Sequence, residues 1–154
     1  MDTAPTPAPP ALGVATERSG DDRGAVSSSP LALVSVSGTY AVCRLDSTAP
    51  VPVWAAGGPF VSVSRTADEL SVVCEERAVP AGVRREGGWR AVRVASTLDF
   101  STTGVLASLV VPLAKAGVSV FVISTFDTDF LLLKGQSFGH AVEALRQAGH
   151  DMRE

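Results

Sequence analysis

Short runs of aliphatic and β-branched residues recur along the chain and predict strands. They cover residues 31–36, 40–45, 60–64, 70–75, 89–95, 118–124 and 130–134. Two other segments space their apolar residues as an amphipathic helix does. These predicted helices are 103–116, with Pro112 near its end, and 137–148, with Ser137 as a candidate N-cap and Gly149 just beyond it.

The order of these elements in the later part of the chain predicts the fold class. A strand at 89–98 is followed by the first helix, strands at 118–124 and 129–134, the second helix and a short terminal strand at 150–153. This order is βαββαβ, which is the ferredoxin-like plan of α+β proteins.

An internal repeat predicts that the earlier part has a related fold. A shift of 60 residues aligns four identical pairs, namely Pro52 with Pro112, Ala56 with Ala116, Gly57 with Gly117 and Ser64 with Ser124. The same shift superimposes the predicted strand 60–64 on 120–124 and the turn 65–69 on 125–129. We interpret this self-similarity as a duplication.

The two copies are unequal in their helices. Segment 77–88 contains Pro80 and three glycines where the second copy has its second helix, and the first helix is reduced to a turn near 52–55. A sheet without covering helices must pack against another surface. We therefore expect two ferredoxin-like halves, 31–88 and 89–154, that pack as one compact unit. The helices of the first half are expected to be reduced.

The first 30 residues are rich in Pro, Ala, Ser and Thr and have no hydrophobic periodicity. Such a composition predicts a disordered tail, and it lacks the basic and apolar regions of a secretory signal. Cys43 and Cys74 lie in strand-like runs and are expected to be buried thiols. A cytoplasmic protein is therefore predicted.

Composition and charge exclude several functions. The chain of 154 residues is 45% hydrophobic and has a net charge of −3, without a run of Lys or Arg. We expect neither nucleic acid nor a membrane as a partner, because both are recognised by clustered positive charge and a membrane helix needs roughly 20 apolar residues. No metal-ligand spacing, phosphate-binding loop or nucleophile system is evident, so we expect no metal, no cofactor and no enzyme.

One candidate for a binding site is the junction 99–104, which enters the first helix. The unpaired N–H groups of a helix start can hold a carboxylate, and Gly104 allows close approach to the backbone. The structural alternative is that Ser101, Thr102 or Thr103 caps the helix.

A second candidate is the turn 124–129. Asp127 and Asp129 could bind an ammonium or guanidinium group, although Asp also favours turns for local reasons. The matching turn of the first copy carries Arg65, Asp68 and Glu69, which we interpret as a solvated loop. Trp54 and Trp89 are expected to be core or interface anchors.

Segments 54–74 (WAAGGPFVSVSRTADELSVVC) and 99–133 (DFSTTGVLASLVVPLAKAGVSVFVISTFDTDFLLL) resemble the bacterial tandem ACT-domain proteins, relatives of the CASTOR-type amino-acid-sensing ACT modules. The resemblance covers about residues 40–150. It implies ACT-type βαββαβ modules that bind amino acids at interfaces between paired copies, using positions 99–105 and 122–129. It does not carry arginine specificity across.

Together these observations predict a non-enzymatic, regulatory protein that binds an amino acid. The residues expected to bind it are Asp99, Ser101, Thr102, Thr103, Gly104, Val105, Ser124, Thr125, Phe126, Asp127 and Asp129. A homodimer or a regulated protein partner is expected to share the interface. The alternatives are a partner-binding module with its pocket filled by apolar side chains, and, ranked lowest, an enzyme that uses Asp127 and Asp129 as an acid/base pair.

Overall fold

The computed structural model describes residues 29–153, so the prediction for the N-terminal segment lies largely outside the described residues. The strands are β1 (Ala32–Leu45), β2 (Ser62–Arg65), β3 (Leu70–Glu75), β4 (Arg85–Val94), β5 (Val120–Ser124), β6 (Asp129–Lys134) and β7 (Asp151–Arg153). The helices are α1 (Val105–Lys115) and α2 (Phe138–Gln147). Single 3-10 turns lie at η1 (Val53–Ala55), η2 (Glu76–Ala78) and η3 (Gly135–Ser137).

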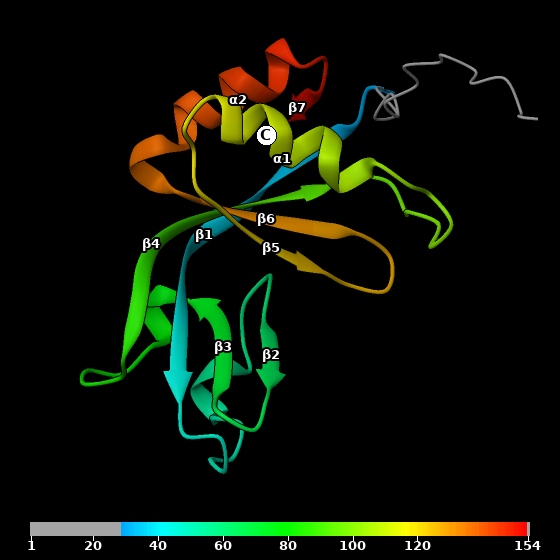
Figure 1. Ribbon diagram of the computed structural model, residues 1–154. Coiled ribbons are helices and arrows are strands. Elements are labelled where there is room, and N and C mark those ends of the chain that lie inside the picture. Colours follow the sequence, from blue (N-terminus) through cyan, green and yellow to red (C-terminus); the bar gives the residue numbers. More distant parts are fainter. Residues whose placement is uncertain (1–28, 154) are drawn as a thin grey trace, which may run out of the picture.

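The strands form one sheet in the order β2-β3-β1-β4-β6-β5, with β7 paired to β1 (Figure 1). Its antiparallel centre is the pair β1 and β4, and each of these long strands serves both halves. The start of β1 (33–36) pairs with the end of β4 (91–94), and its later part (40–43) pairs with 85–89. We call β2 and β3, with the adjoining parts of β1 and β4, the first half, and β5 and β6, with their adjoining parts, the second half.

This arrangement confirms two ferredoxin-like halves and corrects one pairing. In the ferredoxin-like plan the strand after the second helix lies beside the first strand. Here β7 pairs in parallel with the start of β1 (Ala32↔Asp151), and β1 takes the place beside β4. The predicted boundary at residue 88 falls inside β4, and the division into 31–88 and 89–154 stays a prediction.

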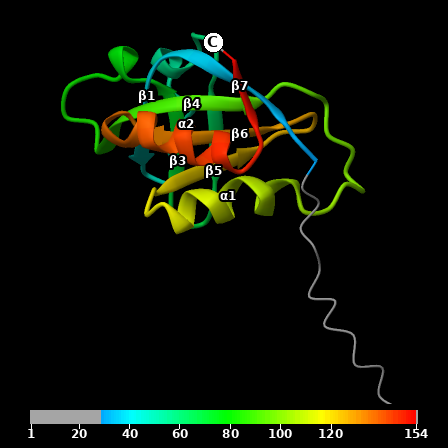
Figure 2. The same ribbon diagram turned by 90° about the horizontal axis from the view of Figure 1, so that it is seen from above.

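Both helices cover the second half, as Figures 1 and 2 show, whereas the first half has only 3-10 turns, as its prolines and glycines predicted. Beneath the helices lies a buried apolar cluster that includes Leu109 and Leu113 of α1 and Leu145 of α2. A central cluster joins the halves through Tyr40, Trp89 and Leu132. Ser137 occupies the N-cap position of α2, as predicted, but its side chain makes no capping hydrogen bond, and Gly149 follows the C-cap residue Ala148 with φ +94°.

The structure also corrects the repeat register. Ala56 and Ala116 both follow the end of the first helical segment, in agreement with the shift of 60. The hairpins, however, close on Arg65↔Leu70 and Ser124↔Asp129, which is a shift of 59. One extra residue lies between these points in the first half, and a one-residue slip moves every side chain of a strand to the other face.

The two cysteines are buried free thiols, as predicted. Both lie in the apolar cluster of the first half, under η1. Burial raises the pKa of Cys43, and it raises the pKa of Cys74 to about 11. Both thiols are therefore protonated and unreactive near neutral pH.

His150, which the sequence analysis left without a role, holds three elements together. Its side chain is almost fully buried, accepts a hydrogen bond from the N–H of Leu31 at Nδ1 (3.3 Å) and donates from Nε2 to the carbonyl of Ser108 in α1 (3.0 Å). These bonds fix the neutral tautomer, because one ring nitrogen must accept while the other donates.

We predict that His150→Phe lowers the free energy of unfolding by about 1–3 kcal/mol, because the N–H of Leu31 and the carbonyl of Ser108 lose their buried partner. Chemical denaturation measures this loss. The control is His140→Phe, at an exposed position of α2, which should change stability by no more than about 0.5 kcal/mol. Equal losses in both variants would contradict the role assigned to His150.

Candidate functional site

A cavity of about 240 Å³ lies where the loop from β4 to α1 meets the turn between β5 and β6. We call it the site cavity. Its lining comes from those two loops and the start of α1: Leu98, Asp99, Phe100, Thr102, Gly104, Val105, Leu106, Ser124, Thr125, Phe126, Asp127, Thr128 and Asp129. The fold thus brings the two predicted segments together, because β4 pairs with β6.

The start of α1 is open toward this cavity. Gly104 occupies the N-cap position with φ +83°, a left-handed conformation that favours glycine, and no described side chain caps the helix. The first helical hydrogen bond runs from the N–H of Ser108 to the carbonyl of Gly104 (2.9 Å). The alternative that Ser101, Thr102 or Thr103 caps α1 is therefore wrong, and the first N–H groups of the helix keep their capacity to bind an anion.

Asp99 and Ser101 instead form a small turn of their own. The N–H of Ser101 (2.8 Å) and its hydroxyl both donate to Oδ1 of Asp99. These bonds, that of the hydroxyl first, lower the pKa of the exposed Asp99 carboxyl. Asp99 is thereby held as an ionised group at the edge of the site cavity.

The turn between β5 and β6 is tied to the loop that follows β4. The N–H of Leu98 donates to the carbonyl of Asp127 (2.7 Å), and the hydroxyl of Thr128 donates to the carbonyl of Val94 (2.9 Å). Asp129 is 8% exposed and accepts a hydrogen bond from the hydroxyl of Ser124. Both walls of the site cavity are thus fixed relative to each other by backbone and side-chain bonds.

Charge in the site cavity is of one sign. Asp99, Asp127 and Asp129 line it, and no Lys, Arg or His of the described residues does so. The positive end of the α1 dipole is the opposing electrostatic feature. A ligand that combines a cationic group with an anionic group would meet favourable partners for both.

Two aromatic rings stand at the surface beside the cavity. Phe100 and Phe126 are 78% and 79% exposed, and their rings meet edge to face with centroids 5.0 Å apart. Each ring comes from one of the two loops, so their contact joins the walls. Such exposure of large apolar groups marks a surface that another molecule can cover.

Nine of the eleven predicted residues line the cavity, and the two that do not are Ser101 and Thr103. Sequence reasoning missed Leu98, Phe100, Leu106 and Thr128. Phe100 and Thr128 lie within the predicted segments 99–104 and 124–129, so the sequence pattern located the segments but not every side chain that lines the cavity. Which side chains point inward follows from the loop conformations.

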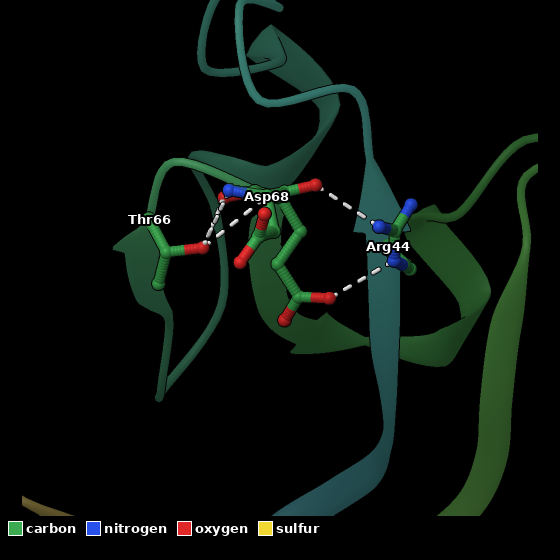
Figure 3. Close-up of polar contacts among 4 residues, drawn as sticks. Arg44, Thr66 and Asp68 are labelled. Atoms are coloured by element: carbon green, nitrogen blue, oxygen red, sulfur yellow. Dashed lines mark hydrogen bonds and ion pairs between the residues drawn. The ribbon is translucent and has the colours of Figure 1, made fainter.

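In the first half the matching turn and the loop before it are bound by arginine side chains. The guanidinium of Arg65 donates to the carbonyl of Ser47 and to that of Ala49 (2.8 Å). Arg44 pairs with the carboxylate of Glu69 (2.9 Å), and Figure 3 shows it beside the turn of Thr66 and Asp68. The turn predicted to be a solvated loop is therefore cross-linked to its surroundings.

The two tryptophans contribute to packing rather than to either loop region. Trp89 is buried in the central cluster and its Nε1 donates to the carbonyl of Glu86 (3.1 Å). Trp54 packs against the cluster of the first half. Over residues 29–153 no group of three or more His, Cys, Asp or Glu is placed to hold a metal ion, and no described helix is long and apolar enough to cross a membrane.

Known proteins resemble this chain at several levels. A crystal structure from Agrobacterium tumefaciens is similar with a TM-score of 0.78 and 37% identity, over 81% of this chain and 93% of that one. The human cytosolic arginine sensor for mTORC1 subunit 1 is 37% identical over 60 residues, which is 38% of this chain and 18% of the sensor. The chain thus spans less than a fifth of that relative's length.

More distant structures share the fold. The ligand-free regulatory subunit of aspartate kinase from Thermus thermophilus matches 80% of this chain with a TM-score of 0.51 at 11% identity.

Two family models match the chain. One is described as an N-terminal domain and matches residues 38–82, and the other is the ACT domain and matches residues 84–147. With the duplicated ferredoxin-like halves, these matches establish that the chain belongs to the tandem ACT-domain proteins.

Proposed function

We propose that this chain is a non-enzymatic regulatory protein that binds an amino acid in the site cavity. The observation that carries the proposal is the open, uncapped start of α1 facing a turn with acidic side chains. Membership of the ACT-domain family and the likeness to a protein named as an arginine sensor support amino-acid binding in general. The identity of the amino acid is left to experiment.

The carboxylate of the ligand would bind at the start of α1. The first N–H groups of a helix point outward along its axis and carry a partial positive charge. Gly104 has no side chain to obstruct them, and Val105 and Leu106 line the cavity at this point. An α-carboxylate can accept from two such groups, as anions at helix starts do.

The ammonium group would bind on the opposite wall. Asp127 is exposed on the turn and Asp129 is buried at the beginning of β6, so the two present carboxylate oxygens at different depths. Hydrogen bonds between an ammonium and a carboxylate are about twice as strong as neutral ones. Asp99 adds a negative charge at the edge of the cavity. A second cationic group, on the side chain of the ligand, would form an ion pair with it.

We infer that a second surface completes the site. Pockets for small molecules usually enclose about 300–1,000 Å³. The site cavity, at about 240 Å³, is below that range, and the exposed rings of Phe100 and Phe126 stand beside it. A second copy of the chain or a regulated protein partner would cover the two rings and enlarge the site. We place this association in the cytoplasm.

Binding could regulate that association without any chemical step. A ligand held at micromolar affinity supplies about 8 kcal/mol, and coupling between sites needs about 1–3 kcal/mol. Only a ligand with different affinities for the free and the associated state can shift the balance between them. Because the ligand would contact both surfaces, this condition is met by the geometry proposed here.

The alternative of a partner-binding module without a ligand predicts apolar side chains between Gly104 and Asp127. The site cavity there has Thr102, Ser124 and Thr125 among its lining, which favours a polar ligand. The alternative of an enzyme would require Asp127 and Asp129 to act on a substrate as an acid and a base.

We predict that at least one of the standard amino acids raises the melting temperature of the full chain at millimolar concentration, because a ligand that binds only the folded state stabilises it. Thermal-shift titration with each amino acid measures this rise, and calorimetry gives the affinity. The proposal would have to be abandoned if none of them produced a saturable shift.

We further predict that Asp127→Asn and Asp129→Asn each weaken binding of that amino acid by about tenfold or more, since each removes a charge-assisted hydrogen bond to the ammonium group. Asp68→Asn is the matched control, because Asp68 occupies the turn of the first half and should leave the affinity unchanged. Loss of a catalytic turnover in the two variants, with binding retained, would favour the enzyme instead.

A third prediction concerns the charge of Asp99. Ser101→Ala removes the hydroxyl bond that contributes most to the low pKa of this carboxyl, so the pKa should rise toward the ordinary value of an aspartate. An NMR pH titration of the side-chain carboxyl carbons measures it. Asp46, whose pKa is lowered in the same way by Thr48, is the internal control and should titrate as in the wild type.

A further inference from the structure

Arg93 of β4 lines a second cavity, distinct from the site cavity. This second cavity has a volume of about 630 Å³ and lies on the other side of the β5–β6 turn. Its lining comes from β1, the end of β4 and the loop after it, the turn, the start of β6 and the loop before β2, and it includes Ser35, Pro59, Arg93, Thr97, Asp127 and Phe130. Arg93 is partly buried and is the only basic side chain among the described residues that line the cavity.

Arg44 occupies the matching position of the first half. Arg44 pairs across the sheet with Ser71 of β3, and Arg93 pairs with Phe130 of β6. The register of the hairpins relates Ser71 to Phe130 by the shift of 59. Two residues before these partners lie Glu69 in the first half and Thr128 in the second, each at the end of its hairpin turn.

In the first half the turn satisfies the arginine. Nε of Arg44 lies 2.9 Å from Oε2 of Glu69, and its Nη2 donates to the carbonyl of Asp68 (3.0 Å). Figure 3 shows Arg44 facing this turn, with dashed lines for both interactions. The guanidinium is thus held by one carboxylate and one backbone carbonyl.

In the second half neither of the matching groups binds the arginine. Thr128 replaces Glu69, and its hydroxyl donates to the carbonyl of Val94 (2.9 Å). The carbonyl of Asp127, which matches that of Asp68, already accepts from the N–H of Leu98 (2.7 Å). Within residues 29–153 the guanidinium of Arg93 has no ion-pair partner and no side-chain hydrogen bond. A partly buried charge without a partner carries a desolvation cost that a bound anion removes.

We propose that Arg93 is the anchor of a second binding site, which takes the carboxylate of a small molecule. The carboxylate would occupy the place that the Glu69 side chain fills beside Arg44. A carboxylate matches the planar guanidinium in a bidentate geometry. The Asp127 carboxylate also lines this cavity and disfavours a second negative charge on the ligand. The site therefore fits a small molecule with a single carboxylate, with or without an ammonium group.

This site is independent of the amino-acid site proposed above. Arg93 lines only the second cavity and Asp129 lines only the site cavity, whereas Thr125, Asp127 and Thr128 line both. Variants of Arg93 and Asp129 therefore test the two proposals separately. A carboxylate that binds through Arg93 would sustain this inference even if no amino acid bound at the start of α1.

The test is an NMR titration of the full chain with sodium propionate and with β-alanine, following the side-chain Nε–H signal of Arg93. Sodium chloride and sodium phosphate at matched ionic strength are the comparison arms. We expect a saturable response to a carboxylate, and Arg93→Gln to weaken binding by about tenfold or more. Arg44→Gln, the matched control in the first half, should leave the affinity within about twofold of the wild type.

A second variant keeps the proposal falsifiable if Arg93→Gln fails to fold. Thr128→Glu restores the carboxylate that the first half has, so it should pair with Arg93 and abolish binding while the arginine is retained. The proposal is overturned if Thr128→Glu binds propionate as tightly as the wild type, or if Arg93→Gln does. It is equally overturned if sodium chloride shifts the Arg93 signal as much as propionate or β-alanine does, or if phosphate binds more tightly than either carboxylate.

Discussion

The antiparallel pairing of β1 with β4 is the constraint on which the rest of this structure depends. Each strand is long enough, at 14 and 10 residues, to contribute to both halves. The two halves therefore share their central strands and cannot separate as beads on a linker would. Tyr40 of β1 pairs directly with Trp89 of β4 at the crossover, and both side chains belong to the buried central cluster.

The bend of β1 at this crossover has its own structural support. Gly38 has φ +97°, and a Cβ at this position would lie 2.9 Å from a carboxylate oxygen of Glu75. Glu75 is buried to 9% exposure and is paired with Arg77 (2.9 Å). Burial, first, and the nearby Glu75 charge raise the pKa of Tyr40, whose hydroxyl donates to the carbonyl of Ser37 (2.7 Å). Hydrogen-bonded polar groups thus hold the bend at the centre of the sheet.

Duplication around one shared strand pair produces the same hairpin turn twice, and the two turns differ in their contacts. In the first half, Arg44 and Arg65 bind the turn and the preceding loop. In the second half, Ser124 stands in place of Arg65 and Thr128 in place of Glu69, and cavities lie on both sides of the turn. The two copies of the motif thus differ in a definite way: arginine side chains bind the turn of the first half, and cavities flank the turn of the second.

The sequence by itself determined most of the elements, their order and the duplicated α+β plan. It was wrong to divide β1 into two strands, 31–36 and 40–45, and it began β4 at residue 89 instead of Arg85. Hydrophobic periodicity is a local property, so β3 was predicted at its observed bounds, and α1 and α2 to within two residues. The sequence also identified the two segments of the candidate site, because Gly104 and the Asp-rich turn can be recognised locally. Only the tertiary structure decided that β1 lies between β7 and β4 and that a shift of 59 residues relates the two hairpins. It also decided that Arg93 lacks the partner that Arg44 has. These features depend on pairing between residues far apart in the chain, where the geometry of the whole sheet, rather than local preference, sets which side chains meet.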